Sequence, residues 1–185
     1  GRETVAMLKA LAGHGWIETD QHAARLEDLN DRGICPPELF ARRVSFRHAD
    51  MNAIAEDLAG FDFVWSCCAF EHLGSIEHGL AFVRRAMRCL RPGGIAVHTT
   101  EFNLSSNVRT VESRDLSVFR RQDIDRLAAG LAADGHEVWP LNYHPGTGLI
   151  DRYVDLPPYR PEPHLKLRLD RFVISSIGLA IRCAA

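Results

Sequence analysis

Side chains able to do acid–base chemistry gather in two short stretches in the middle of the chain. Residues 66–72 include Ser66, Cys67, Glu71 and His72, and residues 98–103 include His98, Glu101 and Asn103. A histidine titrates near neutral pH and can take a proton from a reacting group, so His72 is the candidate general base. Glu71 either orients this histidine or faces solvent. The structural alternative is that His72 caps or packs on a helix that begins near Ser75.

The residues around these stretches predict a strand–helix–strand unit. The run FDFVWS at 61–66 is short, apolar and aromatic, as in a buried strand. Ile76, Leu80, Val83 and Met87 follow at the spacing of one helical face, and the RPGG sequence at 91–94 ends that helix. IAVHTT at 95–100 predicts a second strand. Two strands joined by a helical crossover lie parallel, and ligands bind beyond their carboxyl ends.

An ordered set of residues in this unit resembles a known family. The set is Asp62, Ser66, Glu71, His72, Leu73, Leu90, Pro92, Gly93 and Gly94. It resembles the fourth and fifth strands of class I S-adenosylmethionine-dependent methyltransferases, of the type 11 and 12 kind. The resemblance implies an α/β fold with a doubly wound, mostly parallel, Rossmann-like sheet and a C-terminal antiparallel hairpin.

The rest of the chain continues the alternation of helices and strands. Helices are predicted at 2–11, 21–30, 53–58 and 117–135, strands at 14–20, 44–51, 136–143 and 171–183, and loops at 31–38 and 103–114. Ser117 is the expected cap of the late helix and Gly135 its end. An irregular excursion at about 144–168 separates the last two strands, which resemble the hairpin that closes the class I sheet. We expect one methyltransferase domain over residues 1–185.

The resemblance also implies a site for S-adenosylmethionine. Asp20, with Gln21 beside it, would accept the ribose hydroxyls, and Asp50 would take the adenine amine with Met51 flanking the ring. Both aspartates have a structural alternative, because each also suits a helix N-cap. Asp20 could equally be a solvated strand end. Gly1 matches the last glycine of the family's glycine-rich loop, so the first strand and the earlier glycines are expected to be missing from this chain. The alternative is a protein that lacks half of its cofactor cradle.

Ser66 and Cys67 would border the methionine part of the cofactor, or else they merely turn the chain. The family resemblance further implies that acceptor-binding residues lie after the strands. The candidates are Glu71, His98, Glu101, Asn103 and Tyr143. For His98 the alternative is a core histidine, and for Tyr143 it is an ordinary surface loop.

The Glu71-His72 pair also resembles ubiquinone-biosynthesis O-methyltransferases, in which a Glu-x-x-Glu-His run is associated with a divalent metal. Cys68 stands here in place of the first glutamate, and a thiol is a poor ligand for a hard cation. We therefore predict no metal from the sequence. The five cysteines contain no C-x-x-C pair, which favours reduced thiols over a zinc knuckle or a disulfide framework.

The amino-acid composition limits the classes of binding partner that we expect. The chain has 185 residues, 25% of them charged, and a net charge of −2, which gives no electrostatic case for nucleic acid or a membrane surface. We expect a cytoplasmic enzyme with a small-molecule acceptor; the sequence leaves the oligomeric state open.

The predicted function is transfer of a methyl group from S-adenosylmethionine to a small molecule or biosynthetic intermediate, at oxygen. One alternative is a non-catalytic, methyltransferase-like binding scaffold. The other is an NAD-dependent oxidoreductase, against which the absence of a Tyr-x-x-x-Lys pair counts.

Overall fold

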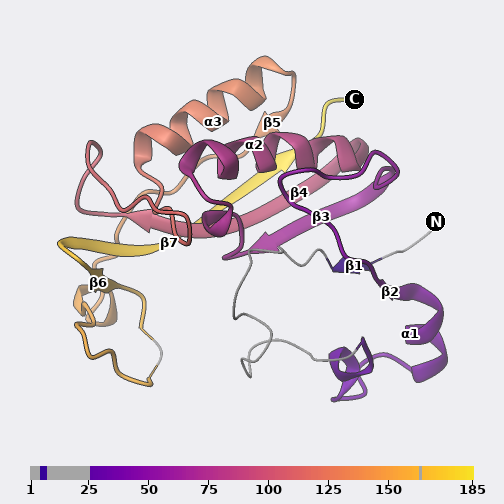
Figure 1. Cartoon of the computed structure of the whole chain (residues 1–185), viewed down its shortest axis with the longest axis horizontal. Helices are drawn as coiled ribbons and strands as arrows, with labels where there is room; N and C mark the ends of the chain where they lie inside the picture. The colour runs from indigo at the N-terminus through magenta and orange to yellow at the C-terminus, as the bar shows by residue number, and fades with distance from the viewer. Residues whose placement is uncertain (1–4, 8–25, 163) are drawn as a thin grey trace. The chain divides into compact units, whose positions relative to one another are not determined.

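The computed structural model describes residues 5–7, 26–162 and 164–185. It divides into two compact units, Gly1–Ala55 and Glu56–Ala185. Figure 1 labels the elements of both units along the chain. Each unit is described below by itself, and the expectation of one methyltransferase domain over the whole chain stays a prediction.

The first unit contains a two-stranded parallel sheet. Strand β1 (Val5–Met7) pairs with β2 (Val44–Phe46), with Val5 opposite Val44. The helix predicted over 2–11 is therefore wrong at residues 5–7, because local apolar spacing does not reveal a partner strand far along the chain. The strand predicted over 44–51 ends at Phe46.

The helices of this unit also differ from the prediction. Helix α1 (Pro37–Arg43) begins inside the predicted loop, where Pro37, an early Glu38 and two late arginines all favour a helix. Residues 26–30 of the predicted helix 21–30 form a 3₁₀ helix, η2 (Leu26–Asn30), and residues 21–25 lie outside the described part. The short helix predicted at 53–58 is wrong, since turns and irregular backbone occupy these residues.

The second unit is built on a five-stranded sheet. Its main path runs β3 (Phe61–Cys67), β4 (Leu90–Asn103), β7 (Phe172–Arg182) and β5 (Glu137–Val138), and β6 (Leu167–Leu169) also pairs with β7. Strands β3 and β4 are parallel, whereas β7 runs antiparallel to β4, β5 and β6. The crossover and the antiparallel C-terminal strands predicted from the sequence are both confirmed. Only β5 is much shorter than expected, because Pro140 cannot donate to the ladder.

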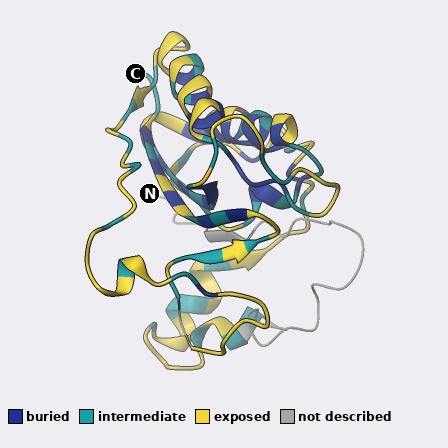
Figure 2. Cartoon of the chain, turned by 90° about the vertical axis from the view of Figure 1, so that its left-hand side faces the viewer, coloured by how far each residue is buried: buried dark blue, intermediate teal, exposed yellow. Residues whose placement is uncertain are grey.

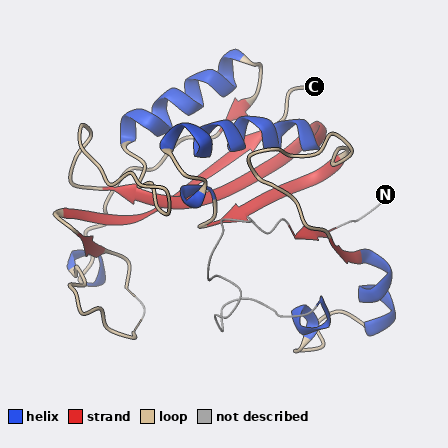
Figure 3. Cartoon of the chain, in the orientation of Figure 1, coloured by secondary structure: helices blue, strands red, loops and turns tan. Residues whose placement is uncertain are grey.

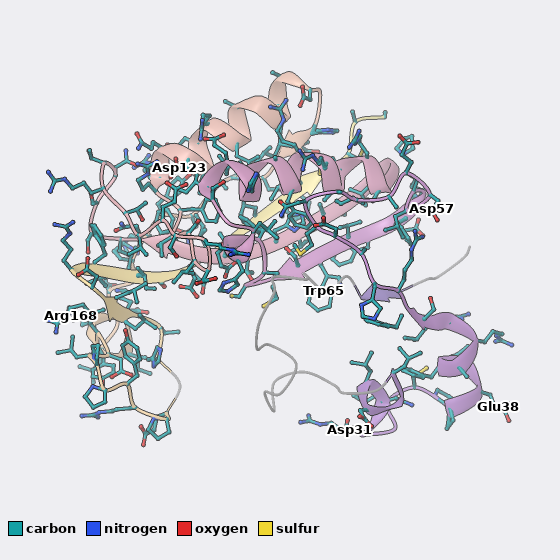
Figure 4. All side chains as sticks on the ribbon, in the orientation of Figure 1. Asp31, Glu38, Asp57, Trp65, Asp123 and Arg168 are labelled. Atoms are coloured by element: carbon teal, nitrogen blue, oxygen red, sulfur yellow. The ribbon has the colours of Figure 1, made fainter. Side chains whose placement is uncertain are left out.

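Two helices cover one face of this sheet. They are α2 (Ile76–Ala86) and α3 (Arg121–Ala133), which lie on the same side of the strands in Figure 3. Their apolar residues form the core with β4 and β7, and Figure 2 shows the buried residues gathered between these layers. On the other face of β3 the aromatic side chains of Phe63 and Trp65 are exposed, and Figure 4 shows Trp65 on the side of β3 away from α2.

The ends of helices α2 and α3 agree with the sequence prediction at some positions and differ from it at others. The Ser75 hydroxyl accepts a hydrogen bond from the His78 amide at 3.1 Å, so α2 begins where the sequence predicted. Helix α3 begins later than expected. Its cap is Arg120, whose amide donates to the Asp123 carboxylate at 2.9 Å. Ser117 is instead buried, and its amide donates to the Glu71 carbonyl. The predicted Ser117 cap is therefore wrong, and the predicted end at Gly135, with φ of +87°, is confirmed.

The loops and remaining turns connect these layers. Two 3₁₀ helices flank α2, η3 (Phe70–His72) before it and η4 (Met87–Cys89) after it, and η5 (Ile150–Arg152) lies in the late irregular excursion. Within the described part of the chain, every helix is too short or too polar to cross a membrane.

Close packing of α2 on the core generates a testable prediction at Gly79. A Cβ at this buried glycine would lie 2.5 Å from the Phe119 ring and 2.8 Å from the Phe70 carbonyl oxygen. We expect Gly79→Ala to lower the free energy of unfolding by about 1–3 kcal/mol, measured by urea denaturation, because overpacking forces side chains and backbone apart.

Gly130 in α3 provides the matched control. A Cβ there would lie 3.6 Å from the nearest heavy atom, in the guanidinium of Arg84, which is ordinary contact. Gly130→Ala should leave stability unchanged or raise it by up to about 1 kcal/mol through helix propensity. Equal effects at the two positions would contradict the packing assignment.

Candidate active site

The parallel pairing of β3 and β4 brings the two polar stretches of the sequence together. Ser66 lies opposite His98 and Cys67 lies opposite Thr99 in the ladder. Both strands end at the same edge of the sheet, so η3 and the end of β4 lie close to each other. Residues 66–72 and 98–103 therefore form one spatial cluster in the second unit.

Glu71 is the most deeply buried charged residue of this cluster. Its side chain has no solvent exposure. The Thr100 hydroxyl donates to Glu71 Oε2 at 3.0 Å, while Oε1 has no hydrogen-bond partner among the described residues. Burial raises the pKa of the Glu71 carboxyl, and the Thr100 hydrogen bond opposes that shift. Of the two roles predicted for Glu71, facing solvent is thereby wrong.

Glu101 and Cys68 complete an acidic group around Glu71. One ligand atom from each of these three residues lies within 4.8 Å of the other two. Burial, with the nearby charge of Glu71, raises the pKa of Glu101 to about 7. Burial and the same charge raise the pKa of the Cys68 thiol to about 11. The edge of the sheet thus holds three acidic groups that burial and mutual repulsion keep protonated to higher pH than usual.

Cys68 has a backbone conformation that few residues adopt. Its φ is +43°, in the left-handed region, and its amide donates to the Thr99 carbonyl at 3.0 Å. The Thr99 hydroxyl lies 3.9 Å from the Cys68 sulfur. The turn after β3 therefore holds the Cys68 thiol next to the side chains at the end of β4.

His72 is oriented by a backbone carbonyl. Its Nδ1 lies 2.6 Å from the Asp115 carbonyl oxygen. Because a carbonyl oxygen only accepts hydrogen bonds, Nδ1 must carry a proton in this arrangement. In the neutral ring Nε2 is then the basic nitrogen, which is the state a general base needs.

His98 lies in the core. It has no solvent exposure, and its ring meets Phe70 and Phe82 edge-on at centroid distances of 6.2 and 5.8 Å. Its Nδ1 lies 2.7 Å from the Ser66 hydroxyl oxygen. Burial lowers the pKa of His98 to about 4. These surroundings favour the core alternative over the acceptor-binding role, and they give Ser66 a structural partner.

Asn103 and Tyr143 both form hydrogen bonds with other segments of the chain. The Asn103 amide nitrogen donates to the Arg109 carbonyl and the Thr110 hydroxyl, and its oxygen accepts from the amides of Ser105 and Ser106. Asn103 therefore organises the loop after β4. The Tyr143 hydroxyl donates to Asp125 at 2.7 Å, and the Arg121 guanidinium lies over the tyrosine ring.

The predicted cofactor residues are placed only in part. Gly1, Asp20 and Gln21 lie outside the described residues. Asp50 is exposed and its carboxylate accepts from the Asn52 amide at 2.8 Å, in a turn with no helix after it, while Met51 is buried. Cys67 is exposed at the end of β3. The cofactor roles of these residues stay predictions.

Three residues of the site escaped sequence reasoning. Thr99 and Thr100 contact the acidic group, and Asp115 positions His72 through its carbonyl. Alternation along residues 95–103 could have placed Thr99 with Glu101 on one face and His98 with Thr100 on the other. The contact with Asp115 uses only its backbone, so no side-chain signal marks it.

Comparison with known proteins identifies the family. A family model described as a methyltransferase domain matches residues 1–98, more than half of the chain. The chain belongs to the class I S-adenosylmethionine-dependent methyltransferase family. This finding confirms the resemblance drawn from the sequence.

Solved structures with the methyltransferase fold resemble this chain at low sequence identity. The methyltransferase domain of bacterial CtHen1-C matches with a TM-score of 0.52 and 16% identity, over 99% of this chain and 78% of that one. The CtHen1-CN form matches with a TM-score of 0.51 and 14% identity, over 97% and 78% of the respective chains. These matches support the same α/β fold.

Other matches involve proteins of greater length. An O-methyltransferase family protein from Burkholderia thailandensis has a TM-score of 0.47 and 12% identity, over 86% of this chain and 41% of that one. This chain spans 38%, 41% and 62% of the lengths of the first three solved structures. A search of curated proteins gave no match.

His98 makes the stability of the folded chain depend on pH. The unfolded chain binds a proton at His98 below its ordinary pKa near 6.5, whereas the folded chain does so only near pH 4. Protonation therefore favours unfolding, and stability is complete above pH 6.5 and falls as the pH drops toward 4, by about 3 kcal/mol from this residue. Denaturant unfolding measures the free energy of unfolding of wild type and of His98→Gln across this pH range. We expect the difference between the two free energies to change by that amount.

An NMR titration of the His98 ring in the wild type gives an independent measurement. A midpoint well below 6 is expected from burial among the phenylalanine rings. A midpoint near 6.5 would contradict the core placement.

Proposed function

We propose that this chain transfers a methyl group from S-adenosylmethionine to an oxygen atom of a small molecule or biosynthetic intermediate. The family match over residues 1–98 is the observation that carries the proposal. The acid–base groups at the carboxyl edge of β3 and β4 support oxygen as the acceptor atom, because a hydroxyl must lose its proton when it is methylated.

Bound S-adenosylmethionine would supply an electrophilic methyl group on a sulfonium. Asp20 would hold its ribose hydroxyls and Asp50 its adenine amine, with Gly1, Gln21 and Met51 completing this part of the site. A carboxylate suits hydroxyl and amine donors, and a thioether packs well on a ring. Ser66 and Cys67 would border the methionine part through their backbone.

His72 is the residue we assign to proton removal. Its Nδ1 donates to the Asp115 carbonyl, so its Nε2 can accept the proton of an acceptor hydroxyl. Methyl transfer itself is an in-line displacement, for which a protein chiefly supplies proximity and orientation. Glu101, with its pKa raised to about 7, and Glu71 would lie beside the acceptor as hydrogen-bonding groups.

Calorimetric titration of the natural full-length protein with S-adenosylmethionine and with NAD separates the candidate functions. Binding of S-adenosylmethionine, followed by release of S-adenosylhomocysteine in a panel of hydroxylated small molecules, is the expected result. Binding without turnover over a broad panel would favour the non-catalytic scaffold. Binding of NAD alone would favour the oxidoreductase.

Asp20→Ala tests the cofactor assignment. Loss of the ribose-binding carboxylate should weaken S-adenosylmethionine binding at least tenfold in the same titration, since a bidentate, charge-assisted contact is removed. Asp28→Ala, which changes another acidic residue of the first unit with no assigned role, is the control and should bind S-adenosylmethionine normally. Unchanged affinity in Asp20→Ala refutes the assignment.

His72→Ala tests the general base. Turnover should fall by about 10²–10⁴-fold while the dissociation constant for S-adenosylmethionine stays within a factor of two. His144→Ala, in the late irregular excursion, is the matched histidine control and should keep full turnover. Wild-type turnover in His72→Ala would mean that another group removes the proton of the acceptor, and it would overturn this role.

A further inference from the structure

We propose that Cys68, Glu71 and Glu101 bind one divalent transition-metal ion of the zinc class at the carboxyl ends of β3 and β4. The proposal concerns binding alone and does not rest on the proposed methyl transfer. It departs from the sequence-based expectation of no metal, because the sequence alone did not place Glu101 beside Cys68 and Glu71.

The geometry brings three ligand types together from three elements. Cys68 follows β3, Glu71 lies in η3 and Glu101 lies in β4, and their ligand atoms are all within 4.8 Å of one another. Zinc binds oxygen or sulfur at about 2.0–2.3 Å. The three ligand atoms therefore form a group compact enough to face a single ion.

Glu71 provides an independent indication of a missing ligand. The side chain is completely buried, Thr100 satisfies Oε2, and Oε1 has no partner in the described part of the chain. A buried carboxylate oxygen without a partner is costly, and a cation is the partner that compensates it best. The same cation would relieve the repulsion between Glu71 and Glu101.

The ligand types select the class of ion. Magnesium and calcium take oxygen ligands, whereas a thiolate with two carboxylates suits zinc or a similar borderline ion. Three protein ligands leave a fourth position for water or an acceptor oxygen. His72 is not part of this set, since its Nδ1 lies against the Asp115 carbonyl and the third ligand comes from β4 instead.

Cobalt titration tests the site without any enzyme assay. Co²⁺ is added to the natural full-length protein after treatment with a chelator, and the near-ultraviolet band of sulfur-to-cobalt charge transfer is recorded. We expect a band that saturates at one Co²⁺ per chain and disappears when Zn²⁺ is added in competition. Binding of Mg²⁺ as tight as that of Zn²⁺ would overturn the choice of ion.

Variants of the three ligands locate the ion. Cys68→Ser should abolish the charge-transfer band, and Glu71→Gln and Glu101→Gln should each weaken Co²⁺ binding at least tenfold. Cys67→Ser is the matched control, because this neighbouring cysteine is the last residue of β3 and lies outside the group. It should keep the full band and affinity.

Circular dichroism verifies that each variant is folded, and Cys68→Ala provides a second removal of the thiol. A band that persists in both Cys68 variants would overturn the proposal. So would equal losses in the Cys67 and Cys68 variants, or an unchanged affinity in Glu101→Gln.

Discussion

The parallel pairing of β3 with β4 is the constraint on which the site depends. It sets Ser66 beside His98 and Cys67 beside Thr99, and it makes both strands end at one edge. Helix α2 carries the chain back between these strands, and its close approach at Gly79 to Phe70 and Phe119 fixes it against the core. Without this crossover, residues 66–72 and 98–103 would have no reason to meet.

Burial acts on the titratable groups of this edge in opposite directions. It raises the pKa of Glu71, Glu101 and Cys68, which are neutral when protonated, and it lowers the pKa of His98, which is neutral when deprotonated. The common cause is the cost of a charge away from water. The Asp115 carbonyl orients His72 at the margin of the site. One strand end thus combines a neutral core histidine, an oriented surface histidine and a group of acids.

Local patterns predicted those elements whose stability is itself local. The apolar stripe of α2, the Ser75 cap, the positive φ of Gly135 and the long apolar run of β7 were all visible in the sequence. Local patterns failed where a distant partner decides the conformation. Val5–Met7 is a strand because it pairs with β2, and Ser117 is buried against the Glu71 carbonyl instead of capping α3.

The sequence by itself determined the family, the crossover and the identity of the polar residues at its end, because motif order and side-chain periodicity are properties of neighbouring residues. Only the tertiary structure decided which of those residues are buried and what they contact. It placed His98 in the core, left one oxygen of Glu71 without a partner among the residues that the structure describes, and brought Glu101 to Cys68. The physical reason is that burial and electrostatic coupling depend on distances across the sheet, which spacing along a single chain does not encode.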